Sequence, residues 1–282
     1  LAKNNLQQSY NDLIKKNNNT AVLILEDGKT IFGTGFGYPG IKAGEMCFNT
    51  SMSGYQEIIT DPSYDGQIIN FTFPHIGNVG TNDEDNEANK SFVSGIITRE
   101  PPPDASNWRS ETNFDEWLKK QNIIGMSGLD TRQLTKIIKD KNAPMGLISH
   151  NVKGQFDLDL LSKKLFNHPK LKGSNLVPNV SSDQVIEWEN GLWEKNSLKN
   201  KKTKLHVVAY DFGIKKNILR CLKNLNVKVS LVPFDFDFVE LRKLKPDGIF
   251  LSNGPGDPMA TYDSIKNNFD NILTLDLPIF GI

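Results

Sequence analysis

The stretch "SNGPGDP", Ser252 to Pro258, contains residues whose types and spacing could do chemistry. It follows the apolar run "GIFL" directly, so it should lie at the carboxyl end of a strand. Glycines have no Cβ, and a loop built on Gly254 and Gly256 can therefore point backbone N–H groups at a ligand or at developing negative charge. Taken alone, the stretch is explained more simply by a tight turn that leads into a helix.

The last residues, "LDLPIFGI" from Leu275 to Ile282, are the second such place. They predict a strand buried on both faces. A strand that ends in "FGI" beside a glycine-rich loop is typical of the lead-in to a nucleophile elbow, where a sharp turn lifts a reactive side chain above the sheet. We therefore expect a nucleophile directly after Ile282, and a second domain that is incomplete at its C-terminus.

Other motifs are weaker candidates. "GFGYPG" matches a dinucleotide fingerprint at Gly35, Gly37 and Gly40, but it follows a predicted hairpin and does not open a helix. The sequence has no P-loop motif. We expect Cys47 and Cys221 to be small buried core residues. The four histidines have no ligand spacing and are expected to be structural: His75, His150, His168 and His206.

Composition excludes several classes of function. The 33 basic and 33 acidic residues cancel, which argues against nucleic acid or an anionic membrane surface as a partner. No apolar run is long enough to span a bilayer. Two distant cysteines suggest neither a disulfide framework nor a zinc site, and no metal is expected. The polar residues 1–20 read as a lead-in and not as a signal peptide, so a cytoplasmic location is expected. A start at Leu1 hints at a longer parent.

Residues 21–150 are expected to form a β-rich α+β domain. Asp27-Gly28 lies between two apolar runs and predicts a tight hairpin with a type I′ turn. "FDEWLKKQN" and "TRQLTKIIKDKN" have helical spacing. Asp130 is the expected N-cap of the second helix, with Gln133 in the capping-box position.

Residues 151–204 have a weaker pattern that ends in "EKNSLKNKKTK", and we interpret them as a connecting region. From residue 205 to 282, strands and amphipathic helices alternate. This β-α-β-α-β-α-β order predicts an α/β domain with a doubly wound parallel sheet. In such sheets ligands bind beyond the carboxyl ends of the strands.

Four blocks of sequence resemble a known family. They are "FNTSMSGYQEIITDPSYDGQIINFTFPHIGNVGTND", "GLDTRQLTKIIKDKNAPMG", "HVVAYDFGIKKNILRCL" and "PDGIFLSNGPGDP". Together they are similar to the small subunit of glutamine-hydrolysing carbamoyl-phosphate synthase, whose C-terminal domain is a class I glutamine amidotransferase. Another amidotransferase, such as an anthranilate or guanylate synthase component, would share the G-P-G loop but not residues 21–150.

The resemblance implies particular site residues. In the family the elbow reads G-I-C-L-G-H-Q, and a later His and Glu activate its cysteine. Gly281-Ile282 match only the first two letters, so no catalytic residue is carried over to this sequence, and the cysteine is expected directly after Ile282. Ser63 resembles the serine that contacts bound glutamine. Gly254 resembles the oxyanion-hole donor, and Gly256 resembles a second backbone contact.

The resemblance also implies a function. The subunit hydrolyses L-glutamine, and its ammonia passes to a large subunit that makes carbamoyl phosphate from bicarbonate and ATP for arginine and pyrimidine synthesis. The implied partner is that large subunit, in a heterodimer. ATP and Mg belong to the large subunit, and this chain is expected to hold no cofactor. Without its nucleophile the chain as written is expected to be inactive, so the alternative is a non-catalytic docking module of a synthetase complex.

Overall fold

The computed structural model describes residues 19–192 and 205–282, which form two compact units. The predicted lead-in, apart from residues 19 and 20, lies outside the described residues. The first unit comprises residues 19–59, 66–85 and 93–170 of the described chain. The second takes residues 60–65 and 86–92 from the N-terminal half and joins them to the residues from 171 onward.

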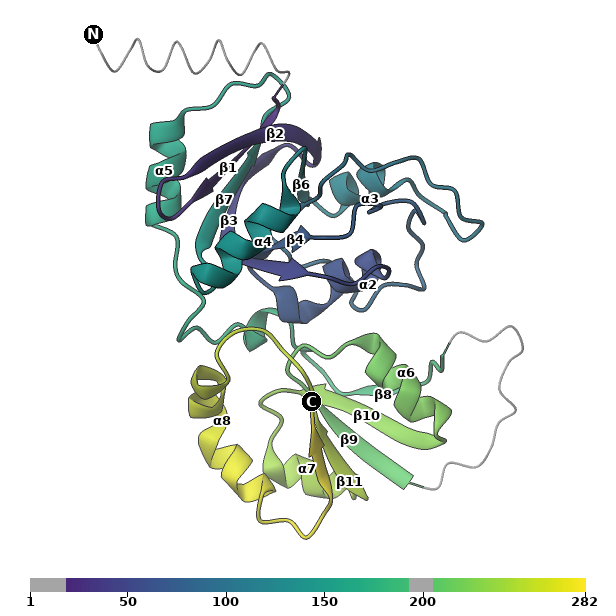
Figure 1. The fold of residues 1–282 in the computed structure, drawn as a ribbon. Helices are drawn as coiled ribbons and strands as arrows, with labels where there is room; N and C mark the ends of the chain where they lie inside the picture. Colours follow the sequence, from purple (N-terminus) through teal and green to yellow (C-terminus); the bar gives the residue numbers. More distant parts are fainter. Residues whose placement is uncertain (1–18, 193–204) are drawn as a thin grey trace. The chain divides into compact units, whose positions relative to one another are not determined.

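The first unit is built on a closed barrel in the order β1-β2-β6-β5-β4-β3-β7 (Figure 1). The barrel closes where β1 pairs antiparallel with β7. β3, β4, β5 and β6 pair in parallel, and the remaining neighbours are antiparallel. The strands are β1 (Ala21–Leu25), β2 (Thr30–Gly37), β3 (Gly40–Asn49), β4 (Gln67–Phe71), β5 (Gly95–Ile97), β6 (Ile124–Ser127) and β7 (Met145–His150).

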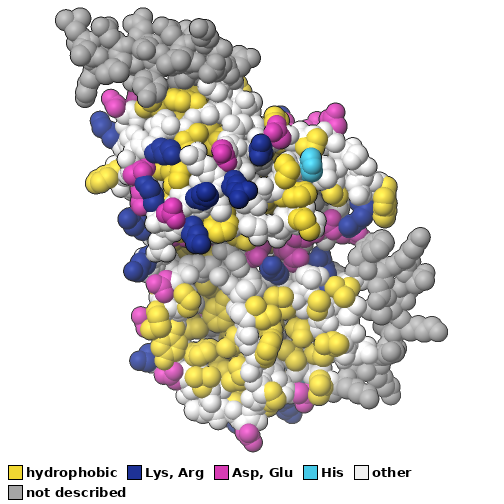
Figure 2. All heavy atoms as spheres, in the orientation of Figure 1, with side chains coloured by type: hydrophobic (Ala, Val, Ile, Leu, Met, Phe, Trp, Pro, Cys, Tyr) yellow, Lys and Arg dark blue, Asp and Glu magenta, His cyan; other side chains and the backbone are white. Residues whose placement is uncertain are grey.

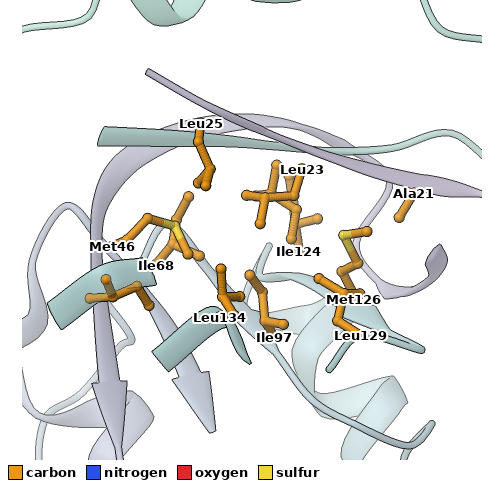
Figure 3. Close-up of a cluster of buried hydrophobic side chains, with 12 residues drawn as sticks. Ala21, Leu23, Leu25, Met46, Ile68, Ile97, Ile124, Met126, Leu129 and Leu134 are labelled. Atoms are coloured by element: carbon orange, nitrogen blue, oxygen red, sulfur yellow. The ribbon is translucent and has the colours of Figure 1, made fainter. Parts of the chain in front are cut away.

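Strand β1 is buried on both of its faces. Ala21, Leu23 and Leu25 point into the cluster drawn in Figure 3, with side chains from the other strands and from α4 (Thr131–Asp140). The intervening Val22 and Ile24 pack in a second cluster with Leu161 and Leu165 of α5 (Leu158–Phe166). Each large aliphatic side chain buried in this way contributes about 1.5–3 kcal/mol.

Both predicted helices of this unit form. α3 (Phe114–Lys120) corresponds to the first, and α4 to the second. Asp130 caps α4 as expected, since its side chain accepts a hydrogen bond from the Gln133 backbone N–H at 2.9 Å. A further short helix, α2 (Tyr55–Thr60), crosses the boundary between the two units in the sequence.

The hairpin at Asp27-Gly28 forms, but its predicted type I′ turn is wrong. The Gly28 N–H donates to the Leu25 carbonyl, and the Leu25 N–H donates to the Lys29 carbonyl. Only Gly28 has positive φ, at +85°, whereas a type I′ turn needs positive φ at Asp27 as well. The loop is therefore a three-residue turn closed by a left-handed glycine, an alternative that the same dipeptide also favours.

The second unit is a five-stranded sheet in the order β12-β11-β9-β10-β8. Its strands are β8 (Ile186–Trp188), β9 (Leu205–Asp211), β10 (Val227–Pro233), β11 (Gly248–Leu251) and β12 (Ile279–Gly281), all parallel except β8, which runs antiparallel to β10. Alternate residues of the sheet pack in two clusters, one with α6 and one with α7 and α8. These helices are α6 (Lys216–Asn224), α7 (Phe238–Leu244) and α8 (Pro258–Ile272). A β-rich N-terminal region followed by an α/β sheet domain is thus confirmed.

Two further expectations differ from the structure. The stretch interpreted as a connecting region contains α5, a short 3₁₀ helix (Val177–Asn179) and β8, and its residues 193–204 lie outside the described part. Strand β12, expected to be buried on both faces, is the edge strand of its sheet. Its Phe280 side chain is 64% exposed, because only β11 flanks it within the described sheet. The exposed apolar side chains of this unit are visible in Figure 2.

The two cysteines have different environments. Cys221 is exposed, contrary to expectation, because the face of α6 that meets the sheet centres on Leu219, and Cys221 lies at its margin beside a cavity of about 440 Å³. Cys47 is half-buried in β3, and burial raises the pKa of its thiol to about 12. Since the thiolate is the reactive form, we expect a thiol reagent at pH 8 to label Cys221 in the native protein. Cys47 should be labelled only after denaturation. The variant C221S retains only Cys47 and C47S retains only Cys221, so equal labelling rates of the two native variants would contradict this.

His150 predicts how stability depends on pH. Its ring is buried beside Gly35, and its Nδ1 has no hydrogen-bond partner. Burial lowers the pKa of His150 below the usual 6.5; a hydrogen bond with the Tyr38 backbone and the charge of Asp115 oppose this, and the charge of Lys119 adds to it. The unfolded chain therefore binds more protons than the folded chain between the folded pKa and about 6.5. Stability should be full above this window and fall as pH drops through it. The denaturation midpoints at pH 5.5 and pH 7.5 should differ less in H150N than in the wild type. An equal difference in both proteins would show that His150 does not cause this pH dependence.

Among the described residues, no helix is long and apolar enough to cross a membrane. No group of three or more His, Cys, Asp or Glu side chains in this part of the chain could hold a metal ion.

Candidate functional site

Two loops of the second unit meet where the order of its sheet reverses. β9 lies in the middle of the sheet, with β10 on one side and β11 on the other. The chain therefore leaves β9 for one neighbour and later returns to the other. In open α/β sheets this switch point leaves a crevice at the carboxyl ends of the strands, where ligands bind. The loops that border it are residues 212–215 after β9 and residues 252–257 after β11.

The loop after β9 is held by a buried carboxylate. Asp211 Oδ1 accepts hydrogen bonds from the backbone N–H groups of Gly213 and Ile214, at 3.0 and 2.9 Å, and its Oδ2 accepts from the Ser182 N–H at 2.9 Å. Gly213 has a φ of +116°, which a residue with a Cβ rarely adopts. Asp211 thereby fixes the sharp turn that joins β9 to α6.

The loop after β11 packs directly on the first loop. Ser252 Oγ accepts a hydrogen bond from the Phe212 N–H at 2.9 Å. A Cβ on Gly254 would lie only 2.0 Å from the Phe212 carbonyl oxygen, and one on Gly256 would lie 2.7 Å from the Ser174 carbonyl oxygen. Only glycine allows this approach, so the two glycines are required here by sterics as well as by any ligand.

Asp257 joins this loop to α8. Its carboxylate accepts a hydrogen bond from the Met259 N–H, and so caps the helix, and another from the Gly173 N–H at 3.1 Å. The Asp257 N–H in turn donates to the Ser174 carbonyl. The chain just before the second sheet therefore backs the G-P-G loop.

Ser63, predicted from the resemblance, belongs to the second unit and meets the same loop. It lies in a 3₁₀ turn (Pro62–Tyr64) capped by Asp61, whose Oδ1 accepts from the Ser63 N–H at 2.9 Å. The Asn253 side chain donates from Nδ2 to Ser63 Oγ at 2.7 Å. Since Asn253 is followed by Gly254, the structure brings the predicted serine together with the predicted glycine loop.

An ion pair adds a second link to that turn. Lys215 Nζ lies 3.1 Å from Asp61 Oδ2, and the Asp61 side chain is almost fully buried. Burial lowers the pKa of Lys215, but the charge and hydrogen bond of Asp61 outweigh it and leave this pKa raised. Lys215 therefore remains a cation at physiological pH.

α6 begins at this point with help from a segment far away in the sequence. The Asn217 N–H donates to Glu87 Oε2 at 2.8 Å, and the Lys216 N–H donates to the Glu87 carbonyl. The helix has no side-chain cap of its own, and the Glu87 carboxylate supplies the missing acceptor and a favourable charge at the helix N-terminus.

A cavity of about 530 Å³ adjoins the G-P-G loop. Asn253, Gly254 and Gly256 line it, together with apolar side chains. The apolar lining includes side chains of β11 and α8 and of Ile282, namely Leu251, Tyr262, Ile265, Phe269 and Ile282. A few convergent polar groups beside an apolar wall are usual in small-molecule sites.

Neither cysteine of the sequence fits the site as a nucleophile. Cys221 lines a different cavity, together with Gly248 and Pro278 at the amino ends of β11 and β12. Cys47 belongs to the barrel unit, and its raised pKa disfavours the thiolate. His206, the one histidine of the second unit within the described residues, is not placed to act as a base either, because its ring nitrogens contact Ser230 Oγ and the Leu244 carbonyl.

Sequence reasoning missed three polar residues of the site: Asp61, Lys215 and Asn253. Asn253 lies in the "SNGPGDP" stretch, but the chemical argument for this stretch used only its glycines. Asp61 precedes a proline and so matches the pattern of a cap, which was a usable local signal. Nothing in the local sequence around Lys215 indicates its partner.

Comparison with protein families identifies the class of this fold and site. Residues 208–282 match the model for glutamine amidotransferase class-I, and residues 23–148 match that for the carbamoyl-phosphate synthase small chain, CPSase domain. The part of the second unit that carries the G-P-G loop is thus of the class I glutamine amidotransferase class, and the barrel region matches the small-chain domain.

Similar proteins make the assignment more specific. The chain is 47% identical over 269 residues to the carbamoyl phosphate synthase small chain of Bradyrhizobium diazoefficiens, covering 93% of this chain and 68% of that protein. It is 46% identical over 263 residues to that of Zymomonas mobilis, covering 92% and 70%. It is 45% identical to the carbamoyl phosphate synthase small chain of Agrobacterium fabrum, and the match covers 93% of this chain and 68% of that protein. This chain belongs to the carbamoyl phosphate synthase small chain family.

Proposed function

We propose that this chain forms the glutamine-binding part of a glutaminase that hydrolyses L-glutamine to glutamate and ammonia. The ammonia passes to a large subunit, which makes carbamoyl phosphate from bicarbonate and ATP for arginine and pyrimidine synthesis in the cytoplasm. The observation that supports this most is the convergence of Ser63, Asn253 and Gly254 at the carboxyl ends of β9 and β11.

The chemistry assigns a role to each group. A thiolate adds to the amide carbonyl of glutamine, and backbone N–H groups of the G-P-G loop stabilise the resulting oxyanion, with Gly254 as the donor. The C–N bond of the adduct then breaks as the nitrogen takes up the proton that the activated thiol gave to its base, so ammonia leaves and a thioester remains, from which water releases glutamate. Ser63 donates a hydrogen bond to bound glutamine, and Gly256 contributes a second backbone contact.

We propose that the nucleophile is supplied from outside residues 1–282; the raised pKa of Cys47 and the place of Cys221 beside a different cavity support this. We propose that residues 1–282 alone bind but do not turn over glutamine. ATP and Mg act in the large subunit, and this chain holds no cofactor of its own. Because residues 1–282 lack a suitable nucleophile, one alternative remains. In it these residues are a non-catalytic docking module of a synthetase complex, which has a structural role and does not bind glutamine.

The test compares two nitrogen sources. The gene product is assembled with its large subunit, and carbamoyl phosphate synthesis is measured with glutamine and with ammonia. S63A should raise the KM for glutamine about threefold to tenfold, because one hydrogen bond is lost, and leave the ammonia-supported rate unchanged. If residues 1–282 bind glutamine and S63A weakens this binding, the alternative of a docking module without a glutamine site is excluded. Assembly with the large subunit without any glutamine-supported synthesis would overturn the glutaminase proposal.

A further inference from the structure

Asn253 makes an unusual number of contacts for one side chain in the candidate site. Its Nδ2 donates to Ser63 Oγ at 2.7 Å and to the Gly213 carbonyl at 3.0 Å, and lies 3.5 Å from Asp61 Oδ1. Its Oδ1 accepts from the Lys215 N–H at 3.4 Å. The side chain thus joins the loop after β11 to the loop after β9 and to the turn that carries Ser63.

The orientation of this amide is fixed by its partners. The Gly213 carbonyl and the Asp61 carboxylate can only accept hydrogen bonds, while the Lys215 N–H can only donate. The amide nitrogen must therefore face Gly213 and Ser63, and the amide oxygen must face Lys215. No rotation of the amide by 180° satisfies the same three backbone and carboxylate groups.

This orientation decides what Ser63 can do. A serine hydroxyl has one proton to donate and lone pairs to accept with. Because Asn253 donates to Ser63 Oγ, the oxygen accepts at this contact and the hydroxyl proton remains unused by it. No other hydrogen bond of this hydroxyl occurs among the residues that the structure describes. The proton is available for an acceptor on a ligand, such as a carboxylate or an amide oxygen.

We infer that Asn253 is a positioning residue that sets Ser63 as a hydrogen-bond donor toward the substrate and holds it against the G-P-G loop. The inference rests on the proposed function, in which Ser63 contacts glutamine. Asn253 itself does not touch the reacting atoms. It acts through Ser63, and its contribution should vanish when the Ser63 hydroxyl is removed.

The nearly isosteric variant N253D tests this polarity. Its carboxylate has no proton to donate, so it would accept the Ser63 proton and take it away from the ligand. In the gene product assembled with its large subunit, the KM for glutamine should rise about threefold to tenfold, as in S63A, with the ammonia-supported rate unchanged. In the double variant S63A/N253D, N253D should change the KM by no more than about twofold relative to S63A alone.

N268D is the matched control in the same unit. Asn268 also bridges two backbone groups, donating from Nδ2 to the Phe236 carbonyl at 2.6 Å and accepting from the Phe238 N–H at 2.7 Å, but it does not line the cavity. Its KM for glutamine should remain within twofold of the wild type. Equal effects of N268D and N253D, or full additivity with S63A, would overturn the inference. If the single variant S63A leaves the KM for glutamine unchanged, the placement of Ser63 in the glutamine site is wrong. If S63A raises this KM but N253D leaves it unchanged, the inference about Asn253 is wrong and the proposed function stands.

Discussion

Replacing Gly254 with alanine should lower the glutamine-dependent rate of the assembled enzyme by at least about 100-fold, the scale of losing one oxyanion donor. The added Cβ would stand 2.0 Å from the Phe212 carbonyl oxygen and 3.1 Å from its Cβ, so the loop must move away from the loop after β9. Gly254 does not have positive φ. The backbone conformation therefore suits alanine, and the expected loss comes from displacement of the loop and its N–H groups.

Two measurements separate displacement from general damage. The ammonia-supported rate should be retained, because that route needs no glutamine site. G40A is the matched control, since Gly40 also lacks positive φ and a Cβ there would meet no atom closer than 3.5 Å. It should leave both rates within about twofold. A G254A enzyme that retains more than a third of its glutamine-dependent rate would exclude Gly254 as the oxyanion donor.

Local patterns were enough to predict most elements. The cap of α4 depends on Asp130 and Gln133, which are neighbours in the sequence, and its prediction is confirmed. The strands and helices of the second sheet follow from apolar periodicity, because each buries a continuous apolar face. The turn at Asp27-Gly28 shows the limit of such reasoning. One dipeptide is compatible with two loop types, and only the observed hydrogen bonds and φ values distinguish them.

The parts that could not be predicted depend on residues far apart in the chain. Asn253 and Ser63 are separated by 190 positions, and Asn217 and Glu87 by 130. No local pattern indicates which distant carboxylate caps a helix, since every acidic side chain offers the same acceptor, and that Glu87 is buried at this place is set by the fold. The prediction that Cys221 is buried was wrong for a related reason. Its helical face is apolar, but how much of that face is covered depends on the neighbouring strands and not on the helix.

Loss of the Asp211 side chain should destabilise the second unit strongly. D211A would leave three backbone N–H groups, those of Ser182, Gly213 and Ile214, without their carboxylate acceptor. Each hydrogen bond to a charged group is worth about 1.5–3 kcal/mol, although water can replace part of it. We expect a loss of at least about 3 kcal/mol in the free energy of unfolding, measured by chemical denaturation with hydrogen exchange followed on peptides of this unit.

Graded variants make the argument for Asp211 specific. D211N keeps one oxygen acceptor but turns an NH₂ group toward a backbone donor, so it should fall between wild type and D211A. D130A is the control for an ordinary cap, since the exposed Asp130 side chain accepts from only one backbone N–H, and should cost about 1 kcal/mol. Because Asp211 shapes the loop against which Gly254 packs, D211N should also raise the KM for glutamine. A D211A protein no less stable than D130A would show that solvent or a rearranged backbone satisfies these three groups, and the turn after β9 would then not depend on its carboxylate.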